Sequence, residues 1–431
     1  MKDFSPRRTL PPDAAPEPPR RPVRGGLFGV LDVGSTKITC LIGRAESDGT
    51  LRVIGFGWQK GRGVRAGGVT DLADAEKAIR TAVGQAEDMA DTSLRAVTAN
   101  LSCGQPESRL FNVQWPVGGR PVAAEDVQRV VYEARARAFA DGRETIHALP
   151  LSFAVDETGD VADPRGLYCE TLTARLHIID AATSALRNFG VCLARADLDI
   201  TAMVSAPFAA GLAVLVEDER MLGATIIDMG GGTTGMAVFG EGQILHTATL
   251  AVGGMHVTND LARLLSTPVA HAERLKTLYG SAEPSPDDER EMLPVPLVGE
   301  EEHHIARVPR AMLVSIIRPR IEETFEMVKE RLEASGLNRI AGTRVVLTGG
   351  AAQLSGVREM AARILGRQIR LGRPHGLRGL PESASGPAFA TAAGLLAWAA
   401  GAGQTMHDLD LTPAAGRGLV GRVIDFLRQR L

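Results

Sequence analysis

The feature that most constrains the fold is an apolar run that ends in an aspartate and enters a glycine-rich turn. The run Ala224–Ile227 leads into Asp228, three glycines and two threonines follow, and a second apolar run covers Met236–Phe239. Two apolar runs joined by a glycine turn predict a β-hairpin. Glycines allow positive φ and let backbone N–H groups approach an anion, and a strand-end carboxylate suits Mg²⁺. The motif therefore predicts a phosphate and metal site, with a plain turn as the alternative.

A second hairpin of the same kind lies near the N-terminus. The stretch FGVLDVGSTK places Asp32 at the end of an apolar run, and a further apolar run covers Ile38–Ile42. Its turn residues are Gly34, Ser35, Thr36 and Lys37. Two such hairpins, about two hundred residues apart, predict a duplicated fold with phosphate between its halves. The pair resembles the two phosphate loops of the actin/Hsp70/sugar-kinase superfamily.

Length and composition exclude several classes of protein. The 431 residues suffice for two large domains, and a net charge of −3 predicts no nucleic-acid partner. The four cysteines show no CxxC pairing, so neither a disulfide framework nor a cysteine metal site is expected. No apolar run reaches the roughly 20 residues of a membrane span, and the N-terminus is proline-rich rather than apolar.

Composition and periodicity divide the chain. Residues 1–26 hold seven prolines among charged residues and predict a disordered tail. Residues 281–304 are rich in proline and acid and predict a surface loop, although His303 and His304 leave a metal site as an alternative. A long amphipathic helix is expected over Pro319–Leu332. The first domain is expected to have its core in 27–100, 180–222 and 386–399, with 101–179 as an inserted α+β subdomain. The second domain is expected to cover 223–385, with 256–324 as its outer part. The remaining units are the tail 1–26, a linker over 400–416 and a terminal helix over 417–431.

Two further pieces suit a nucleotide. The strand that ends at Thr348 runs into Gly349 and Gly350, a turn that lets the backbone lie flat against an adenine or ribose. Glu273 and Lys276 share one face of a predicted helix, where they can bond ribose hydroxyls. A surface ion pair is the alternative for these two residues.

The order of these pieces resembles the FtsA family of bacterial cell-division actins. The segment 101–179, with its Leu101–Gly104 and Ala148–Phe153 stretches, is similar to the subdomain that replaces the usual actin subdomain in that family. The resemblance implies an α/β fold with duplicated actin-like (RNase H-like) domains around a nucleotide cleft, and ATP and Mg²⁺ as cofactors. The matching segments are 27–43, 199–211, 224–239, 345–357 and 386–398.

The resemblance assigns roles to individual residues. Asp32 and Asp228 are expected to hold Mg²⁺ through water. Gly34, Ser35, Thr36, Lys37, Gly230, Gly231, Gly232 and Thr233 are expected to cradle the phosphates, and Glu273, Lys276, Gly349 and Gly350 to contact adenosine. Gly235 stands where the family's second motif commonly has Asp, and Ala202 falls where actin has a water-positioning glutamine. Both departures predict slow hydrolysis at most, so enzyme activity stays an open question.

The resemblance also implies partners. The C-terminal tail of the tubulin-like protein FtsZ is expected to dock on the region 309–320. There Arg310, Arg318 and Arg320 offer cations, and the apolar surface consists of Met312, Leu313, Ile316 and Ile317. The alternative is that the apolar residues of this region only fill the core. Self-association, and binding of other division proteins through the inserted subdomain, are further expectations.

The last fifteen residues, 417–431, predict an amphipathic helix. Such a segment is too short and too charged to span, and it would lie in the interface of an anionic membrane. Docking on the protein's own core is the alternative. The resemblance thus implies a tether between the FtsZ ring and the cytoplasmic face of the inner membrane at the division septum. The apolar face holds Leu419, Val420, Val423, Ile424, Phe426 and Leu427, and the cations are Arg422, Arg428 and Arg430.

The same fold allows three other functions. A sugar or acetate kinase needs a base for its substrate hydroxyl, and no separate Asp or Glu motif suggests one. A pilus-assembly actin shares the inserted subdomain but not a terminal membrane helix. A chaperone is disfavoured because too few residues follow the last connecting helix for a peptide-binding domain.

Overall fold

The computed structural model describes residues 26–138, 140–300 and 305–401, and two similar sheets form its centre. The first sheet has the order β11-β6-β1-β2-β3-β19, and the second has the order β14-β13-β12-β17-β18. The strands of the first sheet are β1 (Leu27–Val33), β2 (Lys37–Ala45), β3 (Leu51–Lys60), β6 (Ala96–Leu101), β11 (Asp199–Ser205) and β19 (Leu377–Arg378). Those of the second are β12 (Ala224–Met229), β13 (Thr234–Gly240), β14 (Gln243–Leu250), β17 (Arg344–Thr348) and β18 (Gln368–Leu371).

The two sheets repeat one arrangement of strands. Each sheet contains an antiparallel hairpin, β1–β2 in the first sheet and β12–β13 in the second. The first strand of each hairpin also pairs in parallel with the strand on its other side, β1 with β6 and β12 with β17. The registers also correspond, because Asp32 pairs with Thr39 in the first hairpin and Asp228 with Gly235 in the second. The predicted duplicated α/β fold is therefore confirmed.

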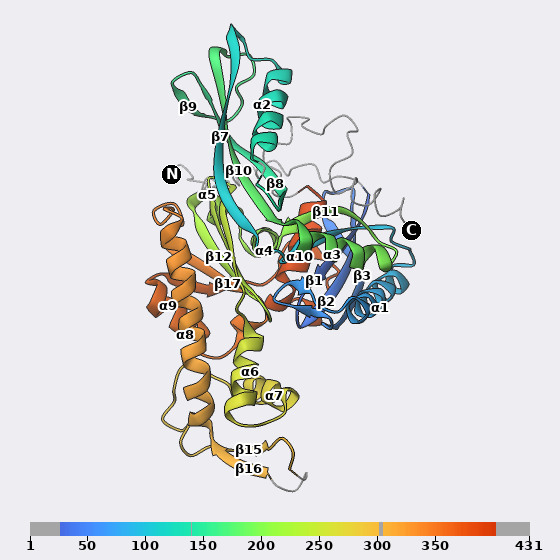
Figure 1. Cartoon of the computed structure of the whole chain (residues 1–431), viewed down its shortest axis with the longest axis vertical. Helices are drawn as coiled ribbons and strands as arrows, with labels where there is room; N and C mark the ends of the chain where they lie inside the picture. The colour runs from blue at the N-terminus through green and yellow to red at the C-terminus, as the bar shows by residue number, and fades with distance from the viewer. Residues whose placement is uncertain (1–25, 139, 301–304, 402–431) are drawn as a thin grey trace, which may run out of the picture.

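Two helices of small residues fill the space between the sheets. Every residue of α4 (Ala206–Val214) is buried, and α10 (Ala390–Ala399) packs against it. A Cβ at Gly394 would lie 1.7 Å from the Ala209 carbonyl oxygen, so only glycine permits this approach. The core between the sheets therefore joins the two halves (Figure 1).

Helices with one buried and one exposed side cover the outer faces. Asp71 caps α1, since its side chain accepts hydrogen bonds from the N–H groups of Ala73 and Asp74. The helices on the first half are α1 (Leu72–Ala90) and α3 (Thr183–Arg195). Those on the second half are α6 (Gly254–Leu264), α7 (Val269–Tyr279), α8 (Arg310–Ala334) and α9 (Val357–Leu365).

The inserted subdomain projects from one end of the molecule (Figure 1). It is a sheet of order β7-β10-β8-β9 with α2 packed on one face, as the predicted α+β insertion requires. At its base, the buried Asp180 carboxylate accepts hydrogen bonds from Arg109 and Arg143. The elements are β7 (Glu107–Pro121), α2 (Ala124–Arg137), β8 (Arg143–Val155), β9 (Thr158–Val161) and β10 (Tyr168–Ala182).

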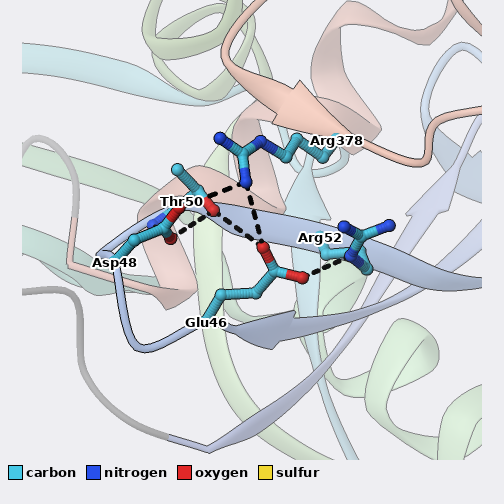
Figure 2. Close-up of polar contacts among 5 residues, drawn as sticks. All are labelled: Glu46, Asp48, Thr50, Arg52 and Arg378. Atoms are coloured by element: carbon cyan, nitrogen blue, oxygen red, sulfur yellow. Dashed lines mark hydrogen bonds and ion pairs between the residues drawn. The ribbon is translucent and has the colours of Figure 1, made fainter.

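The chain returns to the first half earlier than predicted. Strand β19 pairs in parallel with β3, and the Arg378 guanidinium contacts the carboxylates of Glu46 and Asp48 at 3.3 and 3.1 Å. Figure 2 shows this cluster, in which the Thr50 hydroxyl also donates to Glu46 and Asp48. The predicted boundary at residue 385 therefore lies too late in the chain.

Two predicted elements differ in the outer part of the second half. The expected loop 281–304 contains β15 (Met292–Pro296), which pairs with β16 (Ile305–Pro309). Helix α8 begins at Arg310 and includes Pro319, which was expected to start it. Pro319 is exposed, and the buried residues of α8 continue on both sides of it along the helix, so packing outweighs the lost backbone hydrogen bond. These buried residues include Leu313, Ile317, Ile321 and Phe325.

Several predictions fall on residues outside the described ranges. They concern the N-terminal tail, His303 and His304, most of the linker 400–416, and the terminal helix 417–431. No helix in the described part of the chain is both long and apolar enough to cross a bilayer.

Candidate functional site

A cavity of about 730 Å³ lies between the two halves of the molecule. This volume is in the range of sites that bind small molecules and cofactors. Its wall contains every residue that was predicted to contact nucleotide or metal. These are Asp32, Gly34, Ser35, Thr36, Lys37, Asp228, Gly230, Gly231, Gly232, Thr233, Glu273, Lys276, Gly349 and Gly350. Four stretches that are distant in sequence therefore meet at one site.

The two glycine turns have the same geometry. In the first, the Gly34 N–H donates to the Lys37 carbonyl at 2.9 Å, and in the second the Gly230 N–H donates to the Thr233 carbonyl at 2.9 Å. The turns also touch across the cavity. A Cβ at Gly231 would lie 2.3 Å from the Thr36 methyl carbon, so a side chain there would push the turns apart. Glycine thus keeps two sets of backbone N–H groups close together, as an anion site needs.

Two carboxylates stand at the strand ends beside these turns. Burial raises the pKa of Asp32 to about 7, and the charge of Asp228 adds to that effect while Lys37 opposes it. Burial raises the pKa of Asp228 to about 6, opposed first by the Thr391 hydroxyl, which donates to Asp228 Oδ2 at 2.8 Å. A cation bound between these carboxylates would lower both pKa values and favour the ionised form of each side chain.

The side chains that could bind a metal in this cavity suit Mg²⁺ better than a metal whose ligands all come from the protein. Within residues 26–138, 140–300 and 305–401 no group of three His, Cys, Asp or Glu residues could hold a metal. The four cysteines, all within those ranges, are buried and free. Mg²⁺ is commonly bound by one or two carboxylates together with water and substrate phosphates. Asp32 and Asp228 beside two anion-binding turns match that pattern.

Lys37 places a positive charge in the same cavity. Its ammonium donates to the Ala388 carbonyl and lies 3.3 Å from the centroid of the Phe389 ring. Burial lowers the pKa of Lys37 to about 8, and the charges of Asp32 and Asp228 oppose that effect. The amine therefore remains mostly protonated at pH 7 and can neutralise phosphate charge.

The predicted adenosine residues form the other end of the wall. The Lys276 ammonium donates to Glu273 Oε2 at 2.6 Å, to Thr258 Oγ1 at 2.8 Å and to the Gly254 carbonyl at 3.1 Å. The pair is therefore more than a surface ion pair, because it also ties α7 to the start of α6. Gly349 has a φ of 86°, and a Cβ there would lie 2.5 Å from Asp228 Oδ1.

One predicted position is wrong, and several wall residues were missed. Ala202 lies on β11 opposite Thr98 and is not part of the cavity wall, whereas Ala206 and Pro207 at the start of α4 line it beside Gly235. The apolar residues that face the second turn are therefore Ala206 and Pro207 rather than Ala202. The missed wall residues include Asn100, Ser102, Ala388 and Thr391. For Asn100 and Ser102 a signal existed, since ligands of α/β sheets bind at the carboxyl ends of parallel strands.

The predicted peptide dock is only partly available. Arg310 forms an ion pair with the buried Asp288 and donates to the Tyr279 carbonyl, and Arg320 pairs with Asp260 and Glu323. These two cations already have partners inside the molecule, with which an acidic peptide would have to compete, and their part in docking stays a prediction.

The other predicted docking residues also lie on α8. Leu313 and Ile317 are buried in the core, so the prediction that they offer surface is wrong, whereas Met312 is exposed. Arg318 has no ion pair within the described part of the chain. Both Arg318 and Ile316 are half-buried. The surface that remains for a peptide therefore centres on these two side chains and Met312.

The duplicated sheets, the paired aspartate–glycine turns and the cleft between them define an actin-like protein. Similar solved structures include the PilM–PilN type IV pilus biogenesis complex, with a TM-score of 0.62 and 18% identity over 88% of this chain and 99% of that one. MreB5 of Spiroplasma citri bound to ADP has a TM-score of 0.51 and 13% identity over 87% of this chain and 95% of that one. At these identities the likeness shows the fold alone.

Within that class, the chain belongs to the FtsA family of cell division proteins. Residues 225–394 match the profile of "Cell division protein FtsA", and residues 103–180 match "SHS2 domain inserted in FTSA". FtsA of Rhizobium meliloti is 43% identical over 407 residues, which cover 92% of this chain and 91% of that protein. FtsA of Escherichia coli K12 is 33% identical over 377 residues, which cover 85% and 88%. The kinase and pilus-assembly alternatives are therefore set aside.

Proposed function

We propose that this division protein binds ATP with Mg²⁺ in the cleft between its halves. The observation that carries the proposal is the pair Asp32 and Asp228, each at a strand end beside a glycine turn, with the two turns in contact. In this assignment the turns bind the phosphates, Lys37 neutralises their charge, and Gly349 and Lys276 lie along the nucleoside. The MreB5 structure of similar fold contains ADP, which supports a nucleotide in such a cleft.

Calorimetry tests the proposal directly. Asp228→Ala should abolish Mg²⁺-dependent ATP binding, because one of two metal-binding carboxylates is lost. Asp88→Ala is the matched control, since Asp88 is an exposed carboxylate on α1, outside the cavity wall. Equal ATP affinity of Asp228→Ala and the control would remove the assignment.

We further propose that ATP acts as a switch for self-association rather than as a rapidly consumed fuel. The wall beside the second turn includes Ala206, Pro207 and Gly235, none of which has a side-chain group that could orient or deprotonate water. Turnover should then lie below about 1 s⁻¹, the low end for enzymes. A steady-state rate well above that value would contradict the switch.

The proposed partner on α8 is the acidic C-terminal tail of FtsZ. Arg318, Ile316 and Met312 are the predicted docking residues that keep accessible surface without an ion pair in the described part of the chain. Arg318→Glu should weaken binding of the tail peptide by about fivefold, the effect of roughly 1 kcal/mol. Lys329→Glu is the control, because it makes the same charge change at an exposed position on the same helix. Equal affinity of the two variants would count against this dock.

The proposed membrane anchor is the segment 417–431, whose sequence has one apolar and one basic face. Phe426→Glu should abolish sedimentation with anionic liposomes, because it places a charge among residues worth roughly 1.5–3 kcal/mol each when buried. Gln429→Glu adds the same charge to the polar face and should bind nearly as well. Several anchors on one polymer would bind by avidity. If Phe426→Glu still pellets, the anchor lies elsewhere.

These parts combine into one proposal. The protein self-associates with ATP, holds the FtsZ ring to the cytoplasmic face of the inner membrane at the division septum, and offers its inserted subdomain to other division proteins.

A further inference from the structure

Strands β1 and β6 separate at the point where the cavity begins. They pair at Val30 with Thr98 and at Leu31 with Ala99, and no backbone pair continues the ladder. Beyond that point the Asn100 side chain takes over. Its Oδ1 accepts the Val33 N–H at 2.8 Å, and its Nδ2 donates to the Val33 carbonyl at 3.4 Å. One buried amide therefore holds the end of β1 as a neighbouring strand would.

This contact fixes the residues on both sides of Val33. Asp32 precedes it and Gly34, the first residue of the first turn, follows it. Only 4% of Asn100 is exposed, and both ends of its amide already have protein partners. Asn100 is thus placed to act through its neighbours.

The neighbour that faces the cavity is Ser102. Asn100 Nδ2 also donates to Ser102 Oγ at 3.2 Å. A serine hydroxyl has one proton to donate and two lone pairs that accept. Because the Asn100 N–H group occupies one lone pair of Ser102 Oγ, the Ser102 O–H bond is oriented away from Asn100. Its proton is then available to the cavity.

Ser102 lies where the two halves meet around the turns. Gly67 packs against it, since a Cβ at Gly67 would lie 2.2 Å from the Ser102 carbonyl oxygen. The Gly67 N–H is 3.4 Å from Ser35 Oγ, and a Cβ at Gly232 would lie 2.3 Å from that same Ser35 atom. A chain of close contacts therefore joins Ser102 to both glycine turns.

The nucleoside end of the wall is built by other elements. Glu273 and Lys276 come from α7, and Gly349 follows β17, all in the second half. Ser102 follows β6 in the first half. A nucleotide that spans the cavity from the nucleoside end to the turns directs its last phosphate toward the end of the wall that contains both turns and Ser102.

We propose that the Ser102 hydroxyl donates a hydrogen bond to the terminal phosphate of a nucleoside triphosphate, and that Asn100 is the positioning residue that orients it. The pair then sets a preference for the triphosphate over the diphosphate. This inference rests on the proposed nucleotide binding. A hydrogen bond to a charged group contributes about 1.5–3 kcal/mol, which corresponds to roughly 10- to 150-fold in affinity.

Calorimetry with ATP and with ADP, both with Mg²⁺, tests the proposal in the full-length protein. Ser102→Ala should weaken ATP binding at least about tenfold and change ADP binding by less than about twofold. Ser102→Thr keeps the hydroxyl and should retain most of the preference. Asn100→Ala should lower the ATP/ADP affinity ratio, and the double variant should lower it no further than Ser102→Ala, because Asn100 acts through Ser102.

Each result decides the matter. Equal weakening of ATP and ADP in Ser102→Ala, or no change in either, overturns the role of Ser102. If the effects of Asn100→Ala and Ser102→Ala on the ATP/ADP affinity ratio add up in the double variant, the positioning role of Asn100 is overturned. If Asn100→Ala fails to fold, the two Ser102 variants still decide the phosphate contact. If the unmodified protein binds neither nucleotide, the proposed function itself fails, and this inference fails with it.

Discussion

Replacing Thr391 by valine should make metal-dependent nucleotide binding more sensitive to acid. Thr391 is a buried residue of α10, and its hydroxyl donates to Asp228 Oδ2 at 2.8 Å. Valine has nearly the same shape but offers a methyl group in place of the hydroxyl. The Asp228 carboxylate would therefore lose a hydrogen bond that favours its ionised form.

The magnitude follows from the pKa of Asp228, which burial has already raised to about 6. A hydrogen bond to a charged group contributes about 1.5–3 kcal/mol, so its loss should raise this pKa by roughly 1 to 2. At pH 7 the ionised fraction would fall from about 90% to between about 50% and 10%. Because a metal binds the deprotonated ligand, ATP affinity with Mg²⁺ should fall by about two- to tenfold at pH 7.

The assay is titration of ATP with Mg²⁺ between pH 5.5 and 9. In Thr391→Val the acid side of the binding profile should move to higher pH by roughly 1 to 2, and the difference should disappear near pH 9. Thr391→Ser keeps the hydroxyl and should follow the unmodified protein. A profile that weakens equally at every pH would show that the hydrogen bond does not act through the ionisation of Asp228.

Three further predictions concern stability. Without metal, Asp32 and Asp228 have pKa values of about 7 and about 6 in the folded protein against 3.8 ordinarily, so they bind more protons when folded. Their contribution to the free energy of unfolding should fall as pH rises from about 4 to about 7. In thermal melts, added Mg²⁺ should reverse this loss of stability. The variant with both Asp32→Asn and Asp228→Asn should not show the pH-dependent loss. Gly349→Ala should lose ATP binding and stability, whereas Gly366→Ala, also at positive φ but with open space around it, should lose only a little stability in urea titrations. Arg310→Glu should cost about 3–5 kcal/mol of unfolding free energy, because it strips a buried carboxylate of its partner; unchanged urea unfolding would show that this pair is unimportant.

The paired hairpins could be predicted because their signal is local. An apolar run, an aspartate and a glycine turn occupy about ten consecutive residues in each case. The turn chemistry and the strand pattern point to the same structure, and the repetition of the motif indicates the duplication. The inserted subdomain was predictable for a related reason, since its helix and strands have ordinary periodicity.

What the sequence could not reveal depends on contacts between distant segments. Thr391 lies in a uniformly apolar helix, and only the fold brings its hydroxyl to Asp228. The two-residue strand β19 has no periodicity of its own and is held by an arginine that meets the carboxylates of another hairpin (Figure 2). The ion pairs of Arg310 with Asp288 and of Arg320 with Asp260 were equally invisible, because these partners lie 22 and 60 residues away along the chain.

The most direct test of the whole account is a three-component sedimentation measurement. Full-length protein, anionic liposomes and a fluorescent peptide of the FtsZ C-terminal tail are mixed with ATP and Mg²⁺, and the peptide in the pellet is measured. The account predicts that the peptide pellets only when protein, vesicles and ATP are all present, and that Asp228→Ala reduces it strongly. Peptide that stays in the supernatant with all components present, or pellets equally without nucleotide, would contradict an ATP-dependent tether.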